Sequence, residues 1–402
     1  MIVSPTDEQE ELVEDMTKWF RNPCKIKMYY SYSGAAGTGK TTTLEMFMDK
    51  VGLTKAQISA AAYVGKAVLV LLRHGLPAST IHSLIYHTVV EYDKVDSDDD
   101  DEKHFKARLR FILRKELDKP VSLIIIDEAT MVNDYIRDQI LSFGIPVIFL
   151  GDNNQLPPIT GISSVMLHPD FTLTKIMRQA EDDPIVFISQ CILKGIDVDY
   201  GTYGLSSVVD SMKIDSHIVT DYDIIICAKN KTRERLNNEI RTNVLHYGDD
   251  PVIGDKIICR QNNWDRCVDG IYLTNGLLGY ITDISRSRRA KGYLTIDFRP
   301  DFMQDIFEDL RLDYTYLKLP QIDKASYGMS NYDKFEYGYV ITAHLSQGSE
   351  YENVMFIDEP FHDADTTKKL RYTAVTRART SITIVKAYKQ WGYRKMPMVA
   401  RN

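Results

Sequence analysis

The sequence predicts an α/β protein with two lobes, each built on a parallel β-sheet. Its length of 402 residues exceeds the roughly 100–200 residues of one domain, which indicates at least two domains. Apolar runs of strand length alternate with helical patterns in both halves of the chain. Such strands, separated by helices, are typical of a parallel sheet that helices cover on both faces. We therefore place one lobe at residues 1–180 and the other at residues 181–402.

The predicted strands form one set in each lobe. The first set comprises residues 26–30, 58–62, 123–126 and 147–150, and the second comprises residues 224–227, 339–342, 354–357 and 382–385.

Two stretches interrupt the alternation of strands and helices. Residues 83–119 contain the acidic run 96–102 between aromatic and basic segments, which indicates a small insertion in the first lobe. The acidic residues themselves are typical of a solvated loop. Short alternating strands separated by turn signals, at about residues 254–335, indicate a small β-rich insertion in the second lobe.

Composition and charge argue against several classes of protein. A net charge of −7 and a pI near 5.8 give no global electrostatic signature of a nucleic-acid binder, so local grooves would have to carry that function. The five cysteines form no C-x-x-C pair, which argues against a disulfide framework, a zinc ribbon or an iron–sulfur cluster. No apolar run approaches the ~18 residues of a membrane helix, and the acidic N-terminus does not resemble a signal peptide. We expect a cytoplasmic protein with no membrane partner.

Residues 34–41, with the sequence GAAGTGKT, fit the phosphate-loop pattern G-x-x-x-x-G-K-[ST]. They follow a predicted strand and lead into a helical pattern, which is the context that this motif requires. The glycines let backbone N–H groups surround phosphates, Lys40 reaches the β- and γ-phosphates, and the Thr41 hydroxyl ligates Mg²⁺. The sequence therefore predicts a site for ATP and Mg²⁺. Its predicted phosphate-loop residues are Gly34, Ala36, Gly37, Thr38, Gly39, Lys40, Thr41 and Thr42.

The apolar run 124–126 ends in a pair of carboxylates, Asp127 and Glu128. At the carboxyl edge of a parallel sheet, Asp127 can hold Mg²⁺ through water and Glu128 can polarise the water that attacks the γ-phosphate. Gln9 lies before the first strand and could read adenine through its amide. Taken alone, Gln9 is better explained as a solvated helix residue.

The order of motifs along the chain resembles superfamily 1 helicases. Residues 127–131 and 151–158 resemble motifs II and III of that family, and Leu156 with the two following prolines resembles the RecD and Dda branch, superfamily 1B. Further matches to motif Ia, the adjacent DNA-contacting segment and motifs IV, V and VI occur at residues 62–67, 79–83, 173–179, 342–350 and 372–378. The size and the compact insertions are similar to Dda-type phage helicases.

This resemblance implies two RecA-like P-loop lobes, with a hairpin insertion in the first and an SH3-like insertion in the second. It also implies an ATP- and Mg²⁺-dependent DNA helicase that moves 5′→3′ on single-stranded DNA. The expected partners are single-stranded DNA and duplex junctions, and a single-strand-binding or replication protein is a further candidate. We expect a monomer, located in the host cytoplasm if a phage encodes it.

The resemblance assigns further catalytic residues beside Lys40 and Glu128. Gln155 would sense the γ-phosphate. Arg178, and Arg377 at the predicted start of a short helix, would supply cations to it, although an arginine near a domain end is otherwise a surface ion-pair partner. Gly348 and Glu350 would contact the nucleotide, with Glu350 accepting a ribose hydroxyl.

The resemblance also assigns residues to a nucleic-acid track across both lobes. Short polar or ring side chains at element ends suit phosphate and sugar contacts that carry no sequence information. The assigned residues are Lys66, Thr80, His82, Asn230, Asn275, Thr342 and His344, and a turn role is an equal alternative for the two asparagines. The family usually has a proline near Tyr63 and a lysine where this chain has Leu345, so those contacts differ here.

Two aromatic residues of the first insertion, Tyr92 and Phe105, are candidates for stacking on a base of the DNA. The alternative is that both rings fill the small core of the hairpin.

Two other functions fit parts of the pattern. A nucleic-acid-stimulated ATPase could remodel protein–DNA complexes without separating duplexes. A P-loop kinase or sensor would have a small acceptor pocket and no second lobe with arginines.

Overall fold

The computed structural model describes residues 5–22, 27–94, 105–158, 161–176, 183–211, 217–269, 271–288, 292–324 and 332–386. The chain divides into two compact units. The first unit comprises residues 1–153, 157–177 and 253–336, and the second comprises residues 154–156, 178–252 and 337–402. The lobe boundary predicted at residues 180 and 181 stays a prediction.

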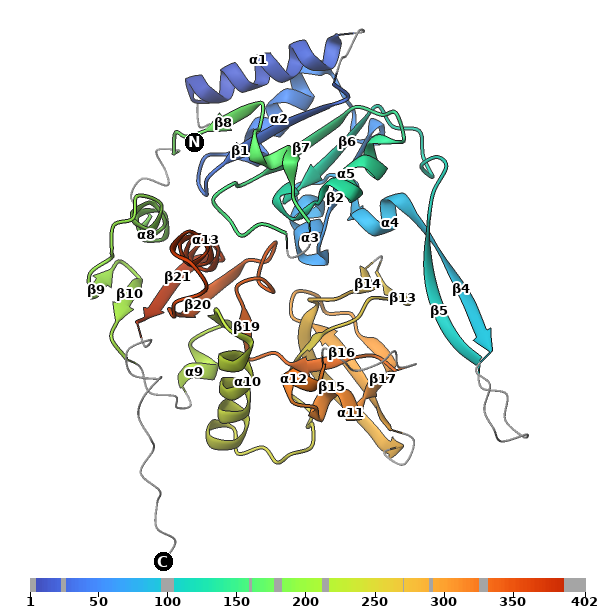
Figure 1. Ribbon diagram of the computed structural model, residues 1–402, viewed down its shortest axis with the longest axis vertical. Helices are drawn as coiled ribbons and strands as arrows, with labels where there is room; N and C mark the ends of the chain where they lie inside the picture. The colour runs from blue at the N-terminus through green and yellow to red at the C-terminus, as the bar shows by residue number, and fades with distance from the viewer. Residues whose placement is uncertain are drawn as a thin grey trace, which may run out of the picture. The chain divides into compact units, whose positions relative to one another are not determined.

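A six-stranded parallel sheet forms the centre of the first unit (Figure 1). Its strand order is β3-β2-β6-β7-β1-β8, and every described pair of neighbours is parallel. The strands are β1 (Tyr29–Gly34), β2 (Ile58–Ala62), β3 (Ala78–Thr80), β6 (Leu123–Asp127), β7 (Val147–Gly151) and β8 (Phe171–Leu173). The prediction of an α/β fold with a parallel sheet is confirmed.

Helices cover both faces of this sheet, as continuous apolar strands require. Side chains of β6 alternate between two cores: Ile125 packs in the core that includes Leu12 and Phe47, whereas Ile124 packs with Ile136 on the other face. The helices of this unit are α1 (Asp7–Arg21), α2 (Lys40–Val51), η1 (Lys55–Gln57), α3 (Gly65–Arg73), α4 (Ile81–Ile85), η2 (Ala129–Met131), α5 (Asp134–Leu141) and α6 (Ser164–Leu167).

A two-stranded antiparallel hairpin follows α4, within the insertion predicted at residues 83–119 (Figure 1). Strand β4 (Tyr86–Lys94) pairs with β5 (Phe105–Leu113), with Tyr86 opposite Leu113 and Lys94 opposite Phe105. The acidic run 96–102 lies outside the described residues, as do the side chains of Tyr92 and Phe105.

A five-stranded sheet, in the order β17-β16-β15-β12-β18, occupies the predicted β-rich insertion. Gly279 in β15 is required there because a Cβ would lie 2.2 Å from the Arg299 carbonyl oxygen of the neighbouring strand. Its SH3-like character stays a prediction. The elements are β12 (Lys256–Cys259), β13 (Asn263–Val268), β14 (Ile271–Leu273), β15 (Leu278–Arg288), β16 (Tyr293–Pro300), β17 (Phe307–Asp313), α11 (Tyr314–Lys318), α12 (Gln321–Lys324) and β18 (Phe335–Tyr337).

The second unit contains another six-stranded sheet, in the order β19-β11-β20-β21-β10-β9. Its neighbours are parallel except for the edge pair β9–β10, which is antiparallel. The strands are β9 (Gly201–Tyr203), β10 (Ser206–Val209), β11 (Ile224–Cys227), β19 (Val340–Thr342), β20 (Tyr351–Ile357) and β21 (Ala378–Val385). The helices are α8 (Pro184–Leu193), α9 (His217–Thr220), α10 (Asn230–Glu239), η3 (Ile240–Val244) and α13 (Ala364–Val375). The predicted second parallel sheet is confirmed.

None of the described helices has both the length and the hydrophobicity needed to cross a membrane.

Candidate nucleotide and nucleic-acid sites

The phosphate loop connects β1 to α2 in the first unit. Gly37 and Gly39 have φ values of +80° and +77°, a region that favours glycine. Gly34 is also required, because a Cβ there would lie 2.5 Å from the Thr38 Oγ1 atom. Lys40 Nζ donates to the Gly34 carbonyl oxygen at 2.7 Å and to the Ala35 carbonyl oxygen at 3.4 Å. The ammonium group is therefore held over the loop, where a helix N-terminus favours anions. Thr41 and Thr42 lie in the first turn of that helix.

Gln9 holds this loop from α1. Its Nε2 atom donates to the Thr38 carbonyl oxygen at 3.0 Å, and its Oε1 atom accepts from the Thr6 N–H at 2.9 Å. The side chain is fully buried, so the interpretation of Gln9 as a solvated helix residue is wrong. Its contact with adenine stays a prediction.

Two carboxylates end strand β6 on the same edge of the sheet as the phosphate loop. The order β6-β7-β1 places only one strand between them, and parallel strands present their carboxyl ends at one edge. Asp127 Oδ1 accepts the Glu128 N–H at 2.7 Å. Tyr32 of β1 donates its hydroxyl to the Lys40 carbonyl oxygen at 3.0 Å. Burial, with the charge of Asp127 as a smaller cause, raises the pKa of Tyr32 well above its usual value.

The polar segment after β7 is also buried. Asp152 is 1% exposed and Gln155 is 6% exposed. The Asn153 N–H donates to Ser33 Oγ at 3.1 Å, which fastens this segment to β1. Gln155 Oε1 is buried and has no hydrogen-bond partner within the described part of the chain. An unpaired buried oxygen costs about 1–3 kcal/mol, so such an atom in a functional motif calls for a ligand or a water.

Residues 154–156 belong to the second unit, where two side chains hold Leu156 by its backbone. Its N–H donates to Thr373 Oγ1 at 3.0 Å, and its carbonyl oxygen accepts from Gln347 Nε2 at 2.8 Å. Both partners are almost fully buried. The sequence reasoning did not select either of them, because a buried glutamine or threonine inside a motif gives no separate signal.

Arg377 is buried in the second unit, with 4% exposure. Its guanidinium donates to the Thr373 carbonyl oxygen at 3.0 Å, the Ser349 carbonyl oxygen at 3.2 Å and Thr376 Oγ1 at 3.2 Å. The interpretation as a surface ion-pair partner is therefore wrong. The predicted position at the start of a helix is also wrong, since Arg377 follows the end of α13 and precedes β21. Arg178 lies outside the described residues.

The two remaining nucleotide candidates lie just after β19. Gly348 has a φ of +69°. The Glu350 side chain is half exposed, and its Oε2 lies 3.8 Å from Arg379 Nε.

Of the nucleic-acid candidates of the first unit, Lys66 lies in the first turn of α3, Thr80 ends β3 and His82 lies in α4. Lys66 Nζ forms an ion pair with Asp301 Oδ2 at 2.8 Å, and both side chains are largely buried. Thr80 Oγ1 accepts the Ser83 N–H at 3.2 Å and so caps α4. The capping role is structural and leaves the DNA contacts of both residues as predictions.

His82 belongs to a cluster of rings at the base of the hairpin. Its ring centroid lies 5.6 Å from Tyr63, 5.5 Å from Tyr86 and 5.7 Å from Phe111. Burial lowers the pKa of His82, which keeps its ring neutral at pH 7. His82, Tyr86 and Phe111 line a pocket of about 590 Å³, together with Arg114.

The candidates of the second unit and of the turns have local roles in the structure. Thr342 Oγ1 accepts the Leu345 N–H at 3.4 Å. Burial, and secondarily His362, lowers the pKa of His344. Asn230 begins α10 and is exposed. Asn275 is exposed, and its N–H donates to Asn262 Oδ1 at 2.7 Å before Gly276, whose φ is +88°.

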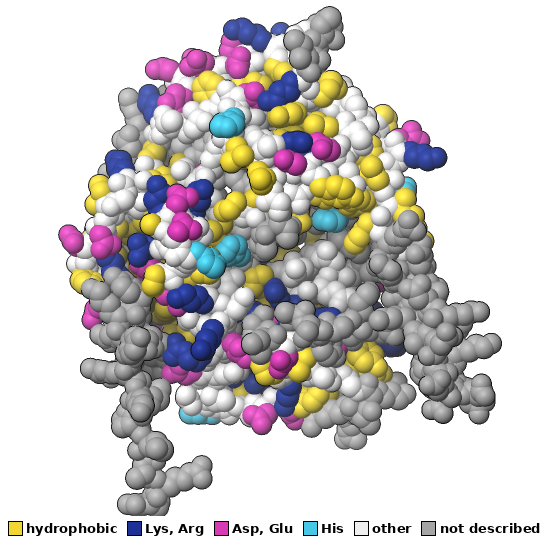
Figure 2. Space-filling view, in the orientation of Figure 1, with side chains coloured by type: hydrophobic (Ala, Val, Ile, Leu, Met, Phe, Trp, Pro, Cys, Tyr) yellow, Lys and Arg dark blue, Asp and Glu magenta, His cyan; other side chains and the backbone are white. Residues whose placement is uncertain are grey.

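The residues present fit a magnesium nucleotide. Within the described ranges, no three or more His, Cys, Asp or Glu side chains form a group that could hold a metal. Mg²⁺ does not need one, since it is usually bound by one or two protein ligands, substrate phosphates and water. The face drawn in Figure 2 shows basic and acidic side chains interspersed.

Comparison with known proteins gives two domain matches. Residues 6–195 match an AAA domain, and residues 337–385 match a UvrD-like helicase C-terminal domain. The chain is 23% identical over 374 residues to the ATP-dependent RecD2 DNA helicase of Deinococcus radiodurans, covering 86% of this chain and 45% of that protein. It is 24% identical over 285 residues to the ATP-dependent DNA helicase dda of Enterobacteria phage T4, covering 62% of each protein. The chain thus spans about half the length of these relatives.

Solved structures share the fold. One is a Pif1 helicase described in DNA unwinding at forked double-stranded DNA, with a TM-score of 0.55 and 19% identity, covering 95% of this chain and 92% of that one. Another is the Pif1 helicase from Bacteroides in complex with ADP-AlF3 and single-stranded DNA, with a TM-score of 0.52, 18% identity and the same coverage.

Proposed function

We propose that the chain is an ATP-dependent DNA helicase of the superfamily 1B type, which the AAA-domain and UvrD-like matches and the similarity to RecD2 and Dda support. It moves along single-stranded DNA in the 5′→3′ direction and separates strands at duplex junctions. Its further proposed partner is a single-strand-binding or replication protein, and it works as a monomer in the cytoplasm.

One observation carries the proposal. Strands β6, β7 and β1 are adjacent and parallel, and their carboxyl ends lead to Asp127, Asp152 and the phosphate loop. Doubly wound sheets bind their ligands at this edge. The loop's left-handed glycines and the Lys40 ammonium suit a polyphosphate, and the neighbouring carboxylates suit the metal ion and the water.

Each residue has a distinct role in the proposed hydrolysis. The phosphate-loop N–H groups and Lys40 bind the β- and γ-phosphates, and Glu128 accepts a proton from the water that attacks the γ-phosphorus. Mg²⁺, bound through Thr41 and Asp127, would neutralise charge that develops on the phosphate oxygens. Arg377 and Arg178 place positive charge beside the γ-phosphate. This charge stabilises the transition state more than the bound ATP.

Nucleic acid coupling follows from Gln155. Its buried, unpaired Oε1 lies one residue before Leu156, whose backbone the second unit holds through Gln347 and Thr373. We assign Gln155 the task of reporting the γ-phosphate to the residues that grip DNA. DNA phosphates and sugars are gripped by Lys66, Thr80, His82, Thr342 and His344.

The test is ATP hydrolysis by the purified chain with and without single-stranded DNA, followed by strand separation on duplexes with a 5′ or a 3′ tail. We expect stimulation by DNA and unwinding only from the 5′ tail. The control is Lys40→Ala, which removes the phosphate-binding cation and should abolish both activities while thermal melting is unchanged. A P-loop kinase would show no stimulation, and a remodelling ATPase would be stimulated without separating either duplex.

A further inference from the structure

The backbone of the proposed water-activating residue is strained. Glu128 has φ +50° and ψ +42°, in the left-handed region that non-glycine residues seldom adopt. Such a conformation costs about 1–3 kcal/mol and persists only where the surrounding structure fixes it. Strain at this residue sets the direction in which its carboxylate leaves β6. What fixes the turn therefore matters for catalysis.

A buried hydroxyl from another part of the first unit donates to the turn after Glu128. The Ala129 carbonyl oxygen accepts from the Val132 N–H at 3.0 Å inside the turn, and from Ser163 Oγ at 3.1 Å. Ser163 is 7% exposed and lies 34 residues further along the chain. The end of β7 supports the same turn, since a Cβ on Gly151 would lie 3.3 Å from the Thr130 N atom.

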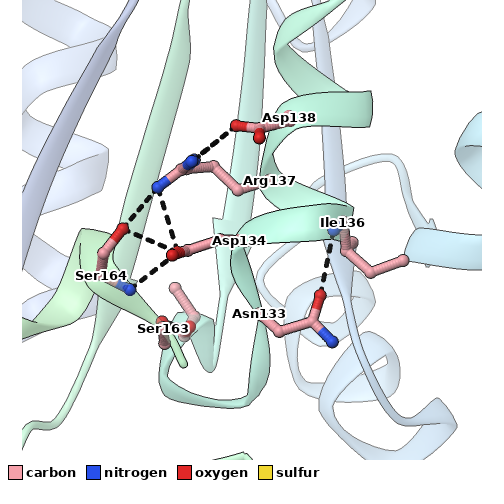
Figure 3. A network of polar contacts seen from close by, with 8 residues as sticks. Asn133, Asp134, Ile136, Arg137, Asp138, Ser163 and Ser164 are labelled. Carbon is pink, nitrogen blue, oxygen red and sulfur yellow. Dashed lines mark hydrogen bonds and ion pairs between the residues drawn. The ribbon is translucent and has the colours of Figure 1, made fainter. Parts of the chain in front are cut away.

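Ser163 precedes a polar network of Ser164, Asp134 and Arg137 at the N-terminus of α5 (Figure 3). Asp134 Oδ1 accepts from the Ser164 N–H at 2.9 Å, from Ser164 Oγ at 2.7 Å and from Arg137 Nη1 at 3.0 Å. The Asp134 N–H donates to the Ile162 carbonyl oxygen at 2.9 Å. Hydrogen bonds therefore hold the residues on both sides of Ser163, whose hydroxyl donates to the Ala129 carbonyl oxygen.

The network stays charged at neutral pH. Desolvation is the largest influence on Asp134 and opposes its ionisation, but the hydrogen bonds from Ser164 and the charge of Arg137 together lower the pKa of this carboxyl. Arg137 also binds Asp138, with an N–O distance of 2.6 Å. All of these residues belong to the first unit.

We propose that Ser163 is a positioning residue for ATP hydrolysis, which holds the Glu128 carboxylate in its productive direction through the Ala129 carbonyl group. The inference rests on the proposed function, because it needs Glu128 to activate the attacking water. Ser163 touches neither nucleotide nor water in this scheme, so its effect belongs to turnover and not to ATP binding.

The test compares Ser163→Ala with Ser163→Thr, which keeps the hydroxyl. We expect the kcat for DNA-stimulated hydrolysis to fall about tenfold in the alanine variant, the scale of one hydrogen bond of about 1.4 kcal/mol. The KM for ATP should stay within twofold, and threonine should restore most of the kcat. Ser189→Ala is the matched control, since Ser189 Oγ donates to the Val186 carbonyl oxygen at 2.8 Å and is equally buried. It should leave kcat unchanged.

A double-mutant cycle with Glu128→Gln separates positioning from general damage. Ser163→Ala should have no further effect on the residual rate when the carboxylate is absent. Equal fold-losses in both backgrounds, or a wild-type kcat in Ser163→Ala, would overturn the proposal. If Ser163→Ala folds poorly, Asp134→Asn, which weakens the bonds to Ser164 and Arg137, should reproduce the kcat loss, and a wild-type kcat there would equally overturn it. Wild-type turnover in Glu128→Gln itself would instead overturn the proposed function.

Discussion

At the scale of single residues, the structure shows which side chains hold the site and which remain to act. Gln9 donates a hydrogen bond to the Thr38 carbonyl oxygen of the phosphate loop. Arg377 donates to two backbone carbonyl oxygens of the second unit. Gln155 Oε1 is buried without a partner in the described part of the chain. Local sequence predicted that these residue types belong to motifs. It could not predict the burial of Gln9, because its contact with Thr38 spans 29 residues and depends on the packing of α1.

Arg377→Ala should lower the kcat for ATP hydrolysis by about 10³-fold or more, the scale of losing an arginine finger. Its melting temperature should also fall, because the Ser349 carbonyl oxygen loses its guanidinium donor, at about 1–3 kcal/mol, whereas the Thr373 carbonyl oxygen keeps a donor in Thr376 Oγ1. Arg377→Lys should give an intermediate kcat, since lysine keeps the charge but not the planar fork. Steady-state kinetics and calorimetry measure both effects.

The control for Arg377 is Arg371→Ala on α13, which removes an ion pair with Asp358 of 2.8 Å in the same unit. We expect it to keep its kcat within a few-fold of wild type, because a partly exposed ion pair contributes only modestly to stability. A near-wild-type kcat in Arg377→Ala would count against the catalytic role of this arginine.

His82 should make stability depend on pH. Its pKa is lowered in the folded chain by burial, so the unfolded chain binds the proton first as pH falls below the ordinary value of about 6.5. The folded state therefore loses stability from that pH downward until the folded pKa is passed. Thermal melting from pH 7.5 to 5 measures the difference in stability between wild type and His82→Asn. Wild type should lose stability relative to the variant as pH falls. A pH-independent difference would contradict this account.

At the scale of elements, long apolar strands were predictable, whereas short strands outside the apolar runs were not. The central strands β6, β7, β11 and β20 coincide with the apolar runs of the sequence, because strands buried on both faces need such runs. The edge strands β3, β8 and β9 have three residues each and lack that signal. Ser163 escaped prediction for a related reason, since a single serine in a loop carries no periodic pattern.

Asp301 on the β-rich sheet should restrain DNA binding by the first unit. Its carboxylate holds Lys66, the predicted phosphate contact, at 2.8 Å in a largely buried ion pair. Asp301→Asn would remove this carboxylate's charge from beside the lysine. We expect the Kd for single-stranded DNA to fall several-fold at low salt, and the slope of log K against log salt to steepen by roughly 0.7, the value for one added phosphate contact.

The matched control for Asp301 is Glu14→Gln, which removes an exposed ion pair with Lys50 in the same unit. Fluorescence anisotropy at several salt concentrations should show no change in its affinity. Adding Lys66→Ala to Asp301→Asn should cancel the gain. An unchanged or weaker affinity in Asp301→Asn alone would argue that Lys66 does not reach DNA.

At the scale of the whole molecule, residues 154–156 belong to the second unit, although the residues on either side of them belong to the first. This three-residue segment contains Gln155 and the Leu156 backbone groups that bond to Gln347 and Thr373. The motif order indicated a sensor glutamine. The assignment of residues 154–156 to the second unit could not be predicted, since it depends on contacts that span 191 and 217 residues.

Gln155→Ala should weaken the link between ATP and DNA. Without the amide, basal ATP hydrolysis should remain measurable while single-stranded DNA stimulates it poorly, and Gln347→Ala should act in the same direction. Gln57→Ala, at an exposed turn of the first unit, is the control. Hydrolysis rates across a DNA titration provide the measurement, and unchanged stimulation in Gln155→Ala would leave this residue as a strand-end cap.

The interrupted composition of the first unit also bears on how the chain is made. Its third stretch, residues 253–336, follows residues 178–252, which belong to the second unit. During synthesis, residues up to 336 must therefore leave the ribosome before the first unit can be completed. Lys66 can form its ion pair only after Asp301, 235 residues later, has been made. A fragment that stops near residue 180 would lack the third stretch of the first unit. It would leave Lys66 of α3 without its ion-pair partner Asp301.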